Sequence, residues 1–204
     1  MLNRRDIKLR GKEAMKANFL ICSIVAMIFF AVSTVVSNSI SANENTFTLI
    51  RLNLVTYLLV KSLLVNPLEV GAAKFFLNNR EGRANFSDLL YGFTCGSYIN
   101  VVAIMLMRDL KVTLWTLLFI IPGLIKGYEY YMIPYLLADD CNLTSNSVFE
   151  RTKEMTNGYK FEIFVFDLSF IGWGIVAVLT LGLGQFYLAP YQCAARAEMY
   201  TDLC

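Results

Sequence analysis

The sequence of 204 residues contains no histidine. Histidine is the commonest general base near neutral pH and the commonest metal ligand, so its absence excludes many catalytic triads and metal sites. The five cysteines form no Cys-x-x-Cys pair, which argues against a zinc site or a thioredoxin-like motif. No Gly-x-Ser-x-Gly motif and no phosphate-binding loop is present. We therefore expect no metal, no cofactor and no catalytic residues.

Charged residues are also scarce, at 17% of the chain, whereas a soluble domain carries about 25%. Hydrophobic residues make up 56% and gather in long apolar runs. This composition predicts an all-α polytopic membrane helix bundle with short amphipathic helices at the membrane interface. The net charge of +2 gives no broad basic field, so we expect no nucleic acid partner.

Apolar stretches long enough for membrane spans, which need about 20 residues, recur along the chain. We predict a leader at residues 1–18 and a single transmembrane domain at 19–204. Its six spans are predicted at about 19–40, 47–77, 89–107, 112–138, 161–181 and 185–203. The second stretch is overlong and contains Pro67, where we expect a kink or an interfacial turn.

The distribution of lysine and arginine predicts the orientation. With these spans and the N-terminus inside, only Arg51, Arg108 and Lys111 fall in outer connections, and most other basic residues fall inside. The positive-inside rule then places both termini in the cytoplasm of a multi-pass protein of the bacterial plasma membrane.

The leader is rich in basic residues and carries one narrow, weakly apolar helical face. That face holds Ile7, Gly11, Ala14, Met15 and Asn18. We predict a helix lying at the membrane surface, with a solvated charged segment as the alternative. The side chains expected to contact lipid headgroups are Arg4, Arg5, Lys8, Lys12 and Lys16.

Five charged residues within the apolar runs form a candidate intramembrane polar site. Lys126 and Glu129 are three residues apart and share a helix face. A charge at bilayer depth costs about 2.5–3.5 kcal/mol, so such residues suggest function, although an internal ion pair or snorkelling is the simpler reading. Asp167 could pair with Lys126 or with Lys61 or accept an indole proton, and a helix-packing role is the favoured interpretation. Glu69 completes the set.

The predicted fourth span contains a Pro122-Gly123 pair. We expect a single tilted crossing, residues 112–138, that is bent at this pair. A tight hairpin at the same pair, with Tyr98–Ile121 as the preceding span, is the alternative. The hairpin would bury three charged residues near mid-membrane: Arg108, Asp109 and Lys111.

Glycine and cap patterns add local expectations. Two Gly-x-x-x-Gly patterns, Gly92 to Gly96 and Gly123 to Gly127, favour close helix packing over dimerisation. Near residue 150 a short polar helix is predicted, with a capping box at Ser147 and Glu150 and a terminal glycine at Gly158. The Asp139-Asp140 pair is read as a polar turn at a helix end.

Several motifs occur together in order. They are "EAMKANF" (Glu13–Phe19), "LWTLLFIIPG" (Leu114–Gly123), "YMIPYLLADD" (Tyr131–Asp140), "KEMTNG" (Lys153–Gly158), "FDLSFIGW" (Phe166–Trp173), "LTLGLG" (Leu179–Gly184) and "PYQCAARAEMY" (Pro190–Tyr200). In this the chain resembles the bacterial integral membrane proteins grouped as domain of unknown function 975, although Thr152 stands where that family is expected to prefer serine. The family is similar to the membrane domain of some glycerophosphodiester phosphodiesterases. The resemblance implies a compact multi-span membrane domain and supplies no catalytic residues.

These features favour a non-enzymatic membrane module that binds or organises lipid or a partner protein. Transport or export of a small amphiphile or peptide is the alternative, because broken helices often build transporter sites. A lipid-headgroup enzyme is the third and weakest hypothesis. The expected partners are membrane lipids, with a second copy of the chain or another membrane protein left open.

Overall fold

The computed structural model describes residues 3–38, 57–180, 182 and 184–204, and in this part of the chain helices occur without strands. The all-α prediction is therefore confirmed. In chain order the elements are α1 (Arg4–Ala17), α2 (Phe19–Asn38), the π-helical turn η1 (Lys61–Val65), α4 (Asn66–Arg80), the 3-10 turn η2 (Phe86–Leu90), α5 (Tyr91–Thr94), α6 (Tyr98–Leu118), α7 (Ile120–Glu129), α8 (Ile133–Asp139), α9 (Ser145–Thr156), α10 (Lys160–Leu179) and α11 (Gln185–Leu203).

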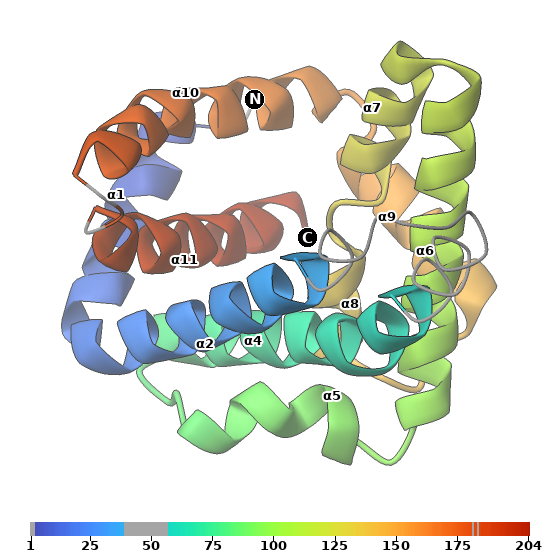
Figure 1. Ribbon diagram of the computed structural model, residues 1–204, viewed down its shortest axis with the longest axis horizontal. Helices are drawn as coiled ribbons and strands as arrows, with labels where there is room; N and C mark the ends of the chain where they lie inside the picture. The colour runs from blue at the N-terminus through green and yellow to red at the C-terminus, as the bar shows by residue number, and fades with distance from the viewer. Residues whose placement is uncertain (1–2, 39–56, 181, 183) are drawn as a thin grey trace, which may run out of the picture.

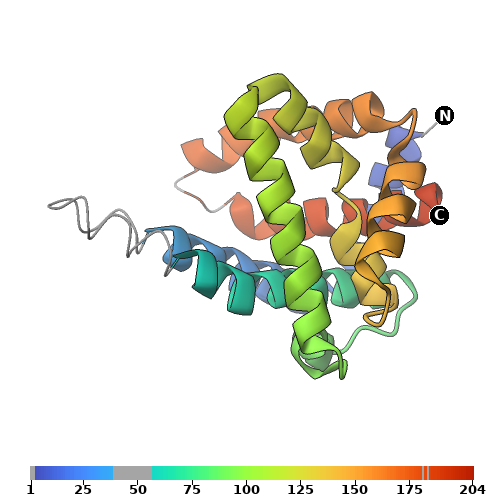
Figure 2. The ribbon, with the colours of Figure 1, turned by 90° about the vertical axis from the view of Figure 1, so that its right-hand side faces the viewer.

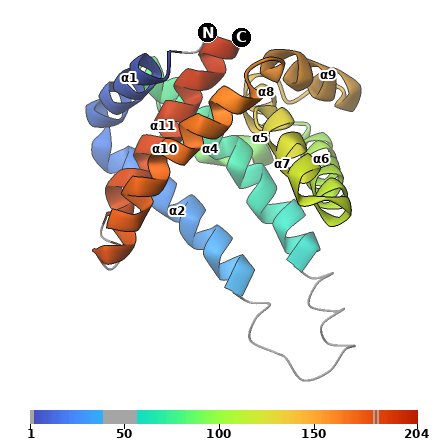
Figure 3. The same cartoon turned by 90° about the horizontal axis from the view of Figure 1, so that it is seen from above.

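Helices α2, α4 and α11 pack against one another, and α10 packs on α11. In Figure 1 these four helices run broadly along the horizontal direction, whereas α6 stands upright across them. Figure 2 shows the same crossing from the side, with α7 folding back along α6. Both chain ends lie on the same side of the molecule, remote from the free ends of α2 and of the helix that leads into α4 (Figure 3).

Helix α1 docks on α11 through the narrow face that the sequence indicates. Ile7, Gly11 and Met15 are buried there. A Cβ atom on Gly11 would lie 2.6 Å from the Cα atom of Ala195, so only glycine permits this approach. The helix prediction for the leader is confirmed, and its apolar face covers protein.

Helix α6 runs without interruption through Arg108–Lys111, where the predicted spans leave a connection. That boundary is wrong. The predicted span at 89–107 is not one helix either, because a turn at 95–97 with Gly96 at φ +81° separates α5 from α6. Residues 39–56, which include the start of the predicted 47–77 span, lie outside the described part of the chain.

The chain reverses direction at Phe119, which has extended backbone angles of φ −153° and ψ 135°. Helix α7 begins at the next residue and packs back on α6. Pro122 is the third residue of α7, where its missing N–H has no partner to lose. The single crossing bent at Pro122-Gly123 is therefore wrong. The chain does reverse as in the hairpin alternative, but the turn lies at Phe119, three residues before Pro122, so the predicted turn position and the predicted helix end at Ile121 are also wrong.

The first glycine of each Gly-x-x-x-Gly pattern allows a close approach. A Cβ atom on Gly123 would lie 2.5 Å from the Cα atom of Thr116, and one on Gly92 would lie 2.1 Å from the carbonyl oxygen of Pro67. Gly127 has no atom within 4 Å of such a Cβ position, and the same holds for Gly96. The packing interpretation is thus confirmed for one glycine of each pair.

The polar helix α9 begins three residues earlier than the predicted capping box. Thr144 is its N-cap, and the hydroxyl oxygen of Thr144 accepts from the backbone N–H of Ser147. The box at Ser147 and Glu150 is therefore wrong. Gly158 has φ +81° directly after the helix, which confirms the predicted terminal glycine.

Among the described residues, no individual helix has both the length and the apolar composition required to cross a membrane. Two consecutive pairs meet that requirement only jointly, and each pair is sharply bent. Arg4–Ala17 meets Phe19–Thr34 at 103°, and Phe86–Thr94 meets Tyr98–Leu118 at 88°.

Candidate polar cavity

A cavity of about 330 Å³ lies where η1 and α4 meet α6, α7, α8 and α11. Five charged residues line it: Lys61, Glu69, Arg108, Asp109 and Arg196. Aromatic and small apolar side chains supply most of the remaining wall, among them Phe29, Ala73, Phe76, Tyr131 and Tyr135. The cavity thus combines a cluster of charged side chains with mostly apolar and aromatic walls.

Arg108 is the most heavily bonded group of the cavity. Its Nη1 and Nη2 atoms donate to the two carboxylate oxygens of Glu69, each at 3.0 Å. The same guanidinium also donates to the Oδ1 atom of Asp109. A bidentate arginine–carboxylate pair is among the strongest protein hydrogen-bond arrangements, so Arg108 is held firmly in place.

The other oxygen of Asp109 faces η1. Lys61 approaches it to 2.9 Å, and the amide of Asn66 donates to it at 3.1 Å. Lys61 and Glu69 are eight residues apart, nearly one residue more than two regular helical turns. The π-helical turn between them absorbs the surplus residue, which explains why both reach α6.

Arg196 is bonded much less completely. Its Nη2 atom donates to the Oδ1 atom of Asp167 at 3.3 Å, and its guanidinium lies over the ring of Tyr131 at 5.3 Å. The Tyr131 hydroxyl donates to the same oxygen of Asp167 at 3.0 Å. The Nε atom of Arg196 is buried without a hydrogen-bond partner. Arg196 thus lines the cavity with one hydrogen bond to a carboxylate, whereas Arg108 makes four.

Lys126 and Glu129 form a separate cluster. Their side chains are 2.6 Å apart, and Lys160 bonds the second oxygen of Glu129. Glu129 is buried, and its backbone carbonyl accepts from the hydroxyl of Thr152 at 3.0 Å. A serine hydroxyl could make the same bond, so the Thr152 departure preserves this chemistry. Neither member of the pair lines the cavity.

The structure therefore divides the five candidate site residues. Lys61 and Glu69 line the cavity, and Asp167 bonds Arg196 at its wall rather than Lys126 or Lys61. Three further charged residues line the cavity and are not among the predicted site residues: Arg108, Asp109 and Arg196. A charge inside an apolar helix is the signal that indicates such a residue, and it is visible in the sequence for Arg196. Arg108 and Asp109 lack this signal because the sequence around them predicts a loop, whereas they lie inside α6.

The basic leader residues have different surroundings from one another. Lys8 donates to the Ser169 hydroxyl, and Lys12 lines a small groove. Arg4, Arg5 and Lys16 are exposed. Burial, with a smaller effect from the charge of Arg4, lowers the pKa of the Lys8 ammonium. Contact of these residues with lipid headgroups stays a prediction.

Asp139 and Asp140 are engaged in structural bonds. The hydroxyl of Tyr200 donates to Asp139, and the backbone N–H of Asn142 donates to Asp140. This agrees with a polar turn at the end of α8. In the part of the chain that the structure describes, no group of three or more acidic or cysteine side chains is placed to hold a metal ion.

A family model described as "Protein of unknown function (DUF975)" matches residues 117–204. The predicted family resemblance is confirmed over this part of the chain. The match includes Asp167 and Arg196, whereas the other cavity charges precede it. No curated protein and no solved structure matches the chain. The similarity to the membrane domain of some phosphodiesterases stays a prediction.

Proposed function

We propose that this protein is a membrane-embedded helical module that binds the polar part of a small amphiphile in its charged cavity. The observation that carries the proposal is the cluster of Lys61, Glu69, Arg108, Asp109 and Arg196 within an apolar bundle. Charges at such depth are costly, and in membrane proteins they mark ligand or ion sites by default.

The outer surface supports a lipid environment. The tip of the α6–α7 hairpin exposes consecutive large apolar side chains, which are Leu117, Leu118, Phe119, Ile120 and Ile121. Exposed apolar residues also occur along α2 and α10. Soluble monomers rarely display contiguous apolar surface of this kind. We place the module in the bacterial plasma membrane with both termini in the cytoplasm, as the positive-inside rule suggests.

Binding without chemistry is the role that the bonding pattern favours. The carboxylates of Glu69 and Asp109 are engaged in ion pairs with Arg108 and Lys61, so their oxygens already have partners within the protein. Arg196 lines the cavity and makes a single hydrogen bond to a side chain among the described residues, to Asp167, which leaves guanidinium donors for an anionic or zwitterionic ligand group.

Native mass spectrometry of the purified protein tests this proposal. Gly127 lines the cavity and has open space beside it, so Gly127→Phe should fill part of the cavity. Gly172 is exposed on α10 and also has open space, so Gly172→Phe is the matched control. We expect a retained amphiphile in the wild type and in the control, with strong depletion in Gly127→Phe. Equal retention in all three proteins would contradict the proposal.

Transport of the same amphiphile is the second candidate. It is favoured by one observation, that the α6–α7 hairpin supplies a cavity wall and reverses at the single extended residue Phe119. Movement of such a hairpin would alternately cover and open the cavity. Counterflow of the retained amphiphile in proteoliposomes would support transport, and its absence from a binding-competent protein would leave binding as the function.

A further inference from the structure

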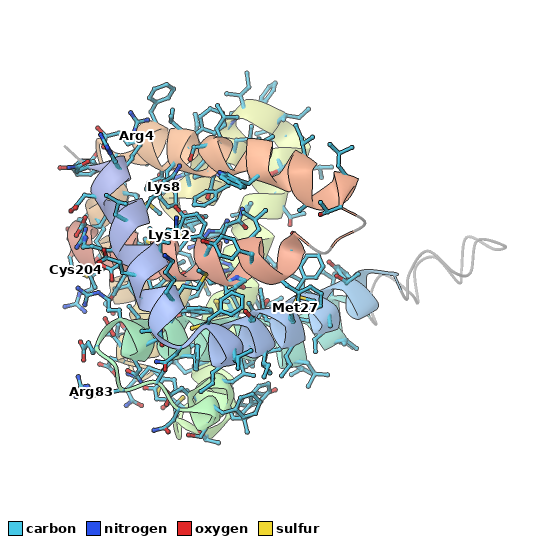
Figure 4. All side chains as sticks on the ribbon, turned by 90° about the vertical axis from the view of Figure 1, so that its left-hand side faces the viewer. Arg4, Lys8, Lys12, Met27, Arg83 and Cys204 are labelled. Atoms are coloured by element: carbon cyan, nitrogen blue, oxygen red, sulfur yellow. The ribbon has the colours of Figure 1, made fainter. Side chains whose placement is uncertain are left out.

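A second and smaller cavity lies between α1, α10 and α11, apart from the central one. Its volume is about 120 Å³. Its lining includes one basic side chain and three aromatic side chains: Lys12, Trp173, Tyr187 and Tyr191. Figure 4 shows α1 crossing this side of the molecule, with Lys8 and Lys12 beside α10 and α11. We call this cavity the α1 groove.

Lys12 supplies the positive charge in the lining of the groove, and Lys8 lies one helical turn away on α1. Lys8 lies over the ring of Phe170 at 4.7 Å, beside Ser169. Lys12 lines the groove one turn further along. In the described part of the chain, neither ammonium has a carboxylate within 4.0 Å. This differs from the central cavity, where each cation has a carboxylate partner.

The acidic groups near α1 are directed elsewhere. Asp6 pairs with Arg10, which also bonds Glu198 and Asp202 on α11. Among the residues that the structure describes, no carboxylate lines the α1 groove. Its field is therefore positive, and its walls are aromatic.

The rim of the groove is suited to a lipid. Trp173 and Tyr187 line it and remain substantially exposed, and exposed Phe186 adjoins Tyr187 in sequence. Tryptophan and tyrosine are favoured at the level of lipid headgroups, where one part of the ring is apolar and another is wet. A phosphate beside Lys12 would thus have apolar surface next to it for the attached glycerol and chains.

We propose that the α1 groove binds the phosphate of a phospholipid headgroup, with Lys12 as its cationic partner and Lys8 one helical turn away, an inference that rests on the proposed membrane location. The lipid would sit between α1 and the α10–α11 pair, so it would join the leader to the bundle. This site is independent of the amphiphile in the central cavity.

Lipid titration of the full-length protein in detergent tests the site. The probes are phosphatidylglycerol, diacylglycerol with the same chains, and inorganic phosphate. The reporter is Trp173 fluorescence in a Trp115→Phe background, since the chain has two tryptophans. Brominated phosphatidylglycerol should quench Trp173, whereas brominated diacylglycerol should quench it much less. Inorganic phosphate should not displace the lipid at matched concentration.

Substitutions assign the effect to the groove. Loss of one charge-assisted contact, about 1.5 kcal/mol or more, should weaken apparent lipid affinity roughly tenfold in Lys12→Gln. Lys12→Arg keeps the positive charge and should retain most of the lipid affinity. This result would show that α1 tolerates a substitution at position 12. Lys16→Gln, on an exposed position of the same helix, should bind as the wild type does.

Three results would overturn the proposal. Equal quenching by brominated diacylglycerol would mean that the phosphate is not recognised. Equal weakening by Lys16→Gln and Lys12→Gln would reduce the effect to surface charge. Full displacement by inorganic phosphate would make free phosphate, rather than a lipid, the ligand. None of these results would bear on amphiphile retention in the central cavity.

Discussion

Arg108, in the middle of α6, donates hydrogen bonds to both carboxylate oxygens of Glu69 on α4, each at 3.0 Å. The two residues are 39 positions apart in the chain. Their side chains are only 14% and 31% exposed. This pair fixes the crossing helix α6 to the α2–α4–α11 group and forms one wall of the central cavity.

Removing one partner of this pair should destabilise the fold. We expect Arg108→Gln to lower the free energy of unfolding by about 3 kcal/mol, because it leaves Glu69 without its cation and Asp109 with Lys61 alone. Glu69→Gln should cost less, since Asp109 still pairs with Arg108. A double-mutant cycle in detergent should give a coupling of about 1–3 kcal/mol. Strict additivity of the two substitutions would contradict this arrangement.

Gly123→Ala should disturb the α6–α7 hairpin. Its new Cβ atom would meet the backbone of Thr116 at 2.5 Å, so we expect a loss of roughly 2 kcal/mol from overpacking. Gly127→Ala is the matched control because nothing lies within 4 Å of its Cβ position. It should be neutral or slightly stabilising, as alanine favours helix over glycine. Thermal unfolding midpoints that rank the two variants in the opposite order would argue against a hairpin at Phe119.

Glu129 should contribute more to folding stability than either of the two lysines with which it pairs. Glu129→Gln leaves Lys126 and Lys160 without their shared carboxylate, and we expect a loss of about 2 kcal/mol. Lys126→Gln should cost about half as much, because Lys160 still neutralises the carboxylate. Glu150→Gln, at an exposed position of α9, should change stability by less than about 0.5 kcal/mol. If Lys126→Gln proved the most damaging of the three, this lysine would have a role beyond the ion pair.

Gly11→Val should detach α1 from α11, because a Cβ atom at this position would meet the backbone of Ala195. Tryptic cleavage after the leader lysines should then become faster. Ala17→Val places the same side chain at an exposed site near the end of the helix and serves as the control. Equal cleavage rates in the wild type and in Gly11→Val would show that α1 is not held by this contact.

The local features of the fold were predictable from the sequence. The narrow face of Ile7, Gly11 and Met15 predicts helix α1, and Gly158 predicts the end of helix α9. Periodicity and backbone freedom act over a few residues, so a single sequence reveals them. The ionic pairing of Lys126 with Glu129 was visible for the same reason, since three residues place both on one helix face.

The cavity could not be predicted because its charges are satisfied by distant residues. Arg108 and Asp109 resemble a polar loop unless Lys61 and Glu69 are known to lie beside them. The reversal at Phe119 has no local signal, because an apolar residue adopts the extended backbone there. The bend was predicted at Pro122 because proline interrupts the interior of a helix, but proline is well tolerated in the first turn, where Pro122 lies.

Photo-cross-linking in intact membranes tests the charged ligand cavity most directly. A photoreactive amino acid replaces Val112, which lines the cavity, and separately replaces Leu117, which is 84% exposed on the same helix. Captured molecules are identified by mass spectrometry. Position 112 should capture one headgroup class in excess, whereas position 117 should capture the bulk lipid mixture. The same mixture at both positions, or no small-molecule adduct at position 112, would contradict it.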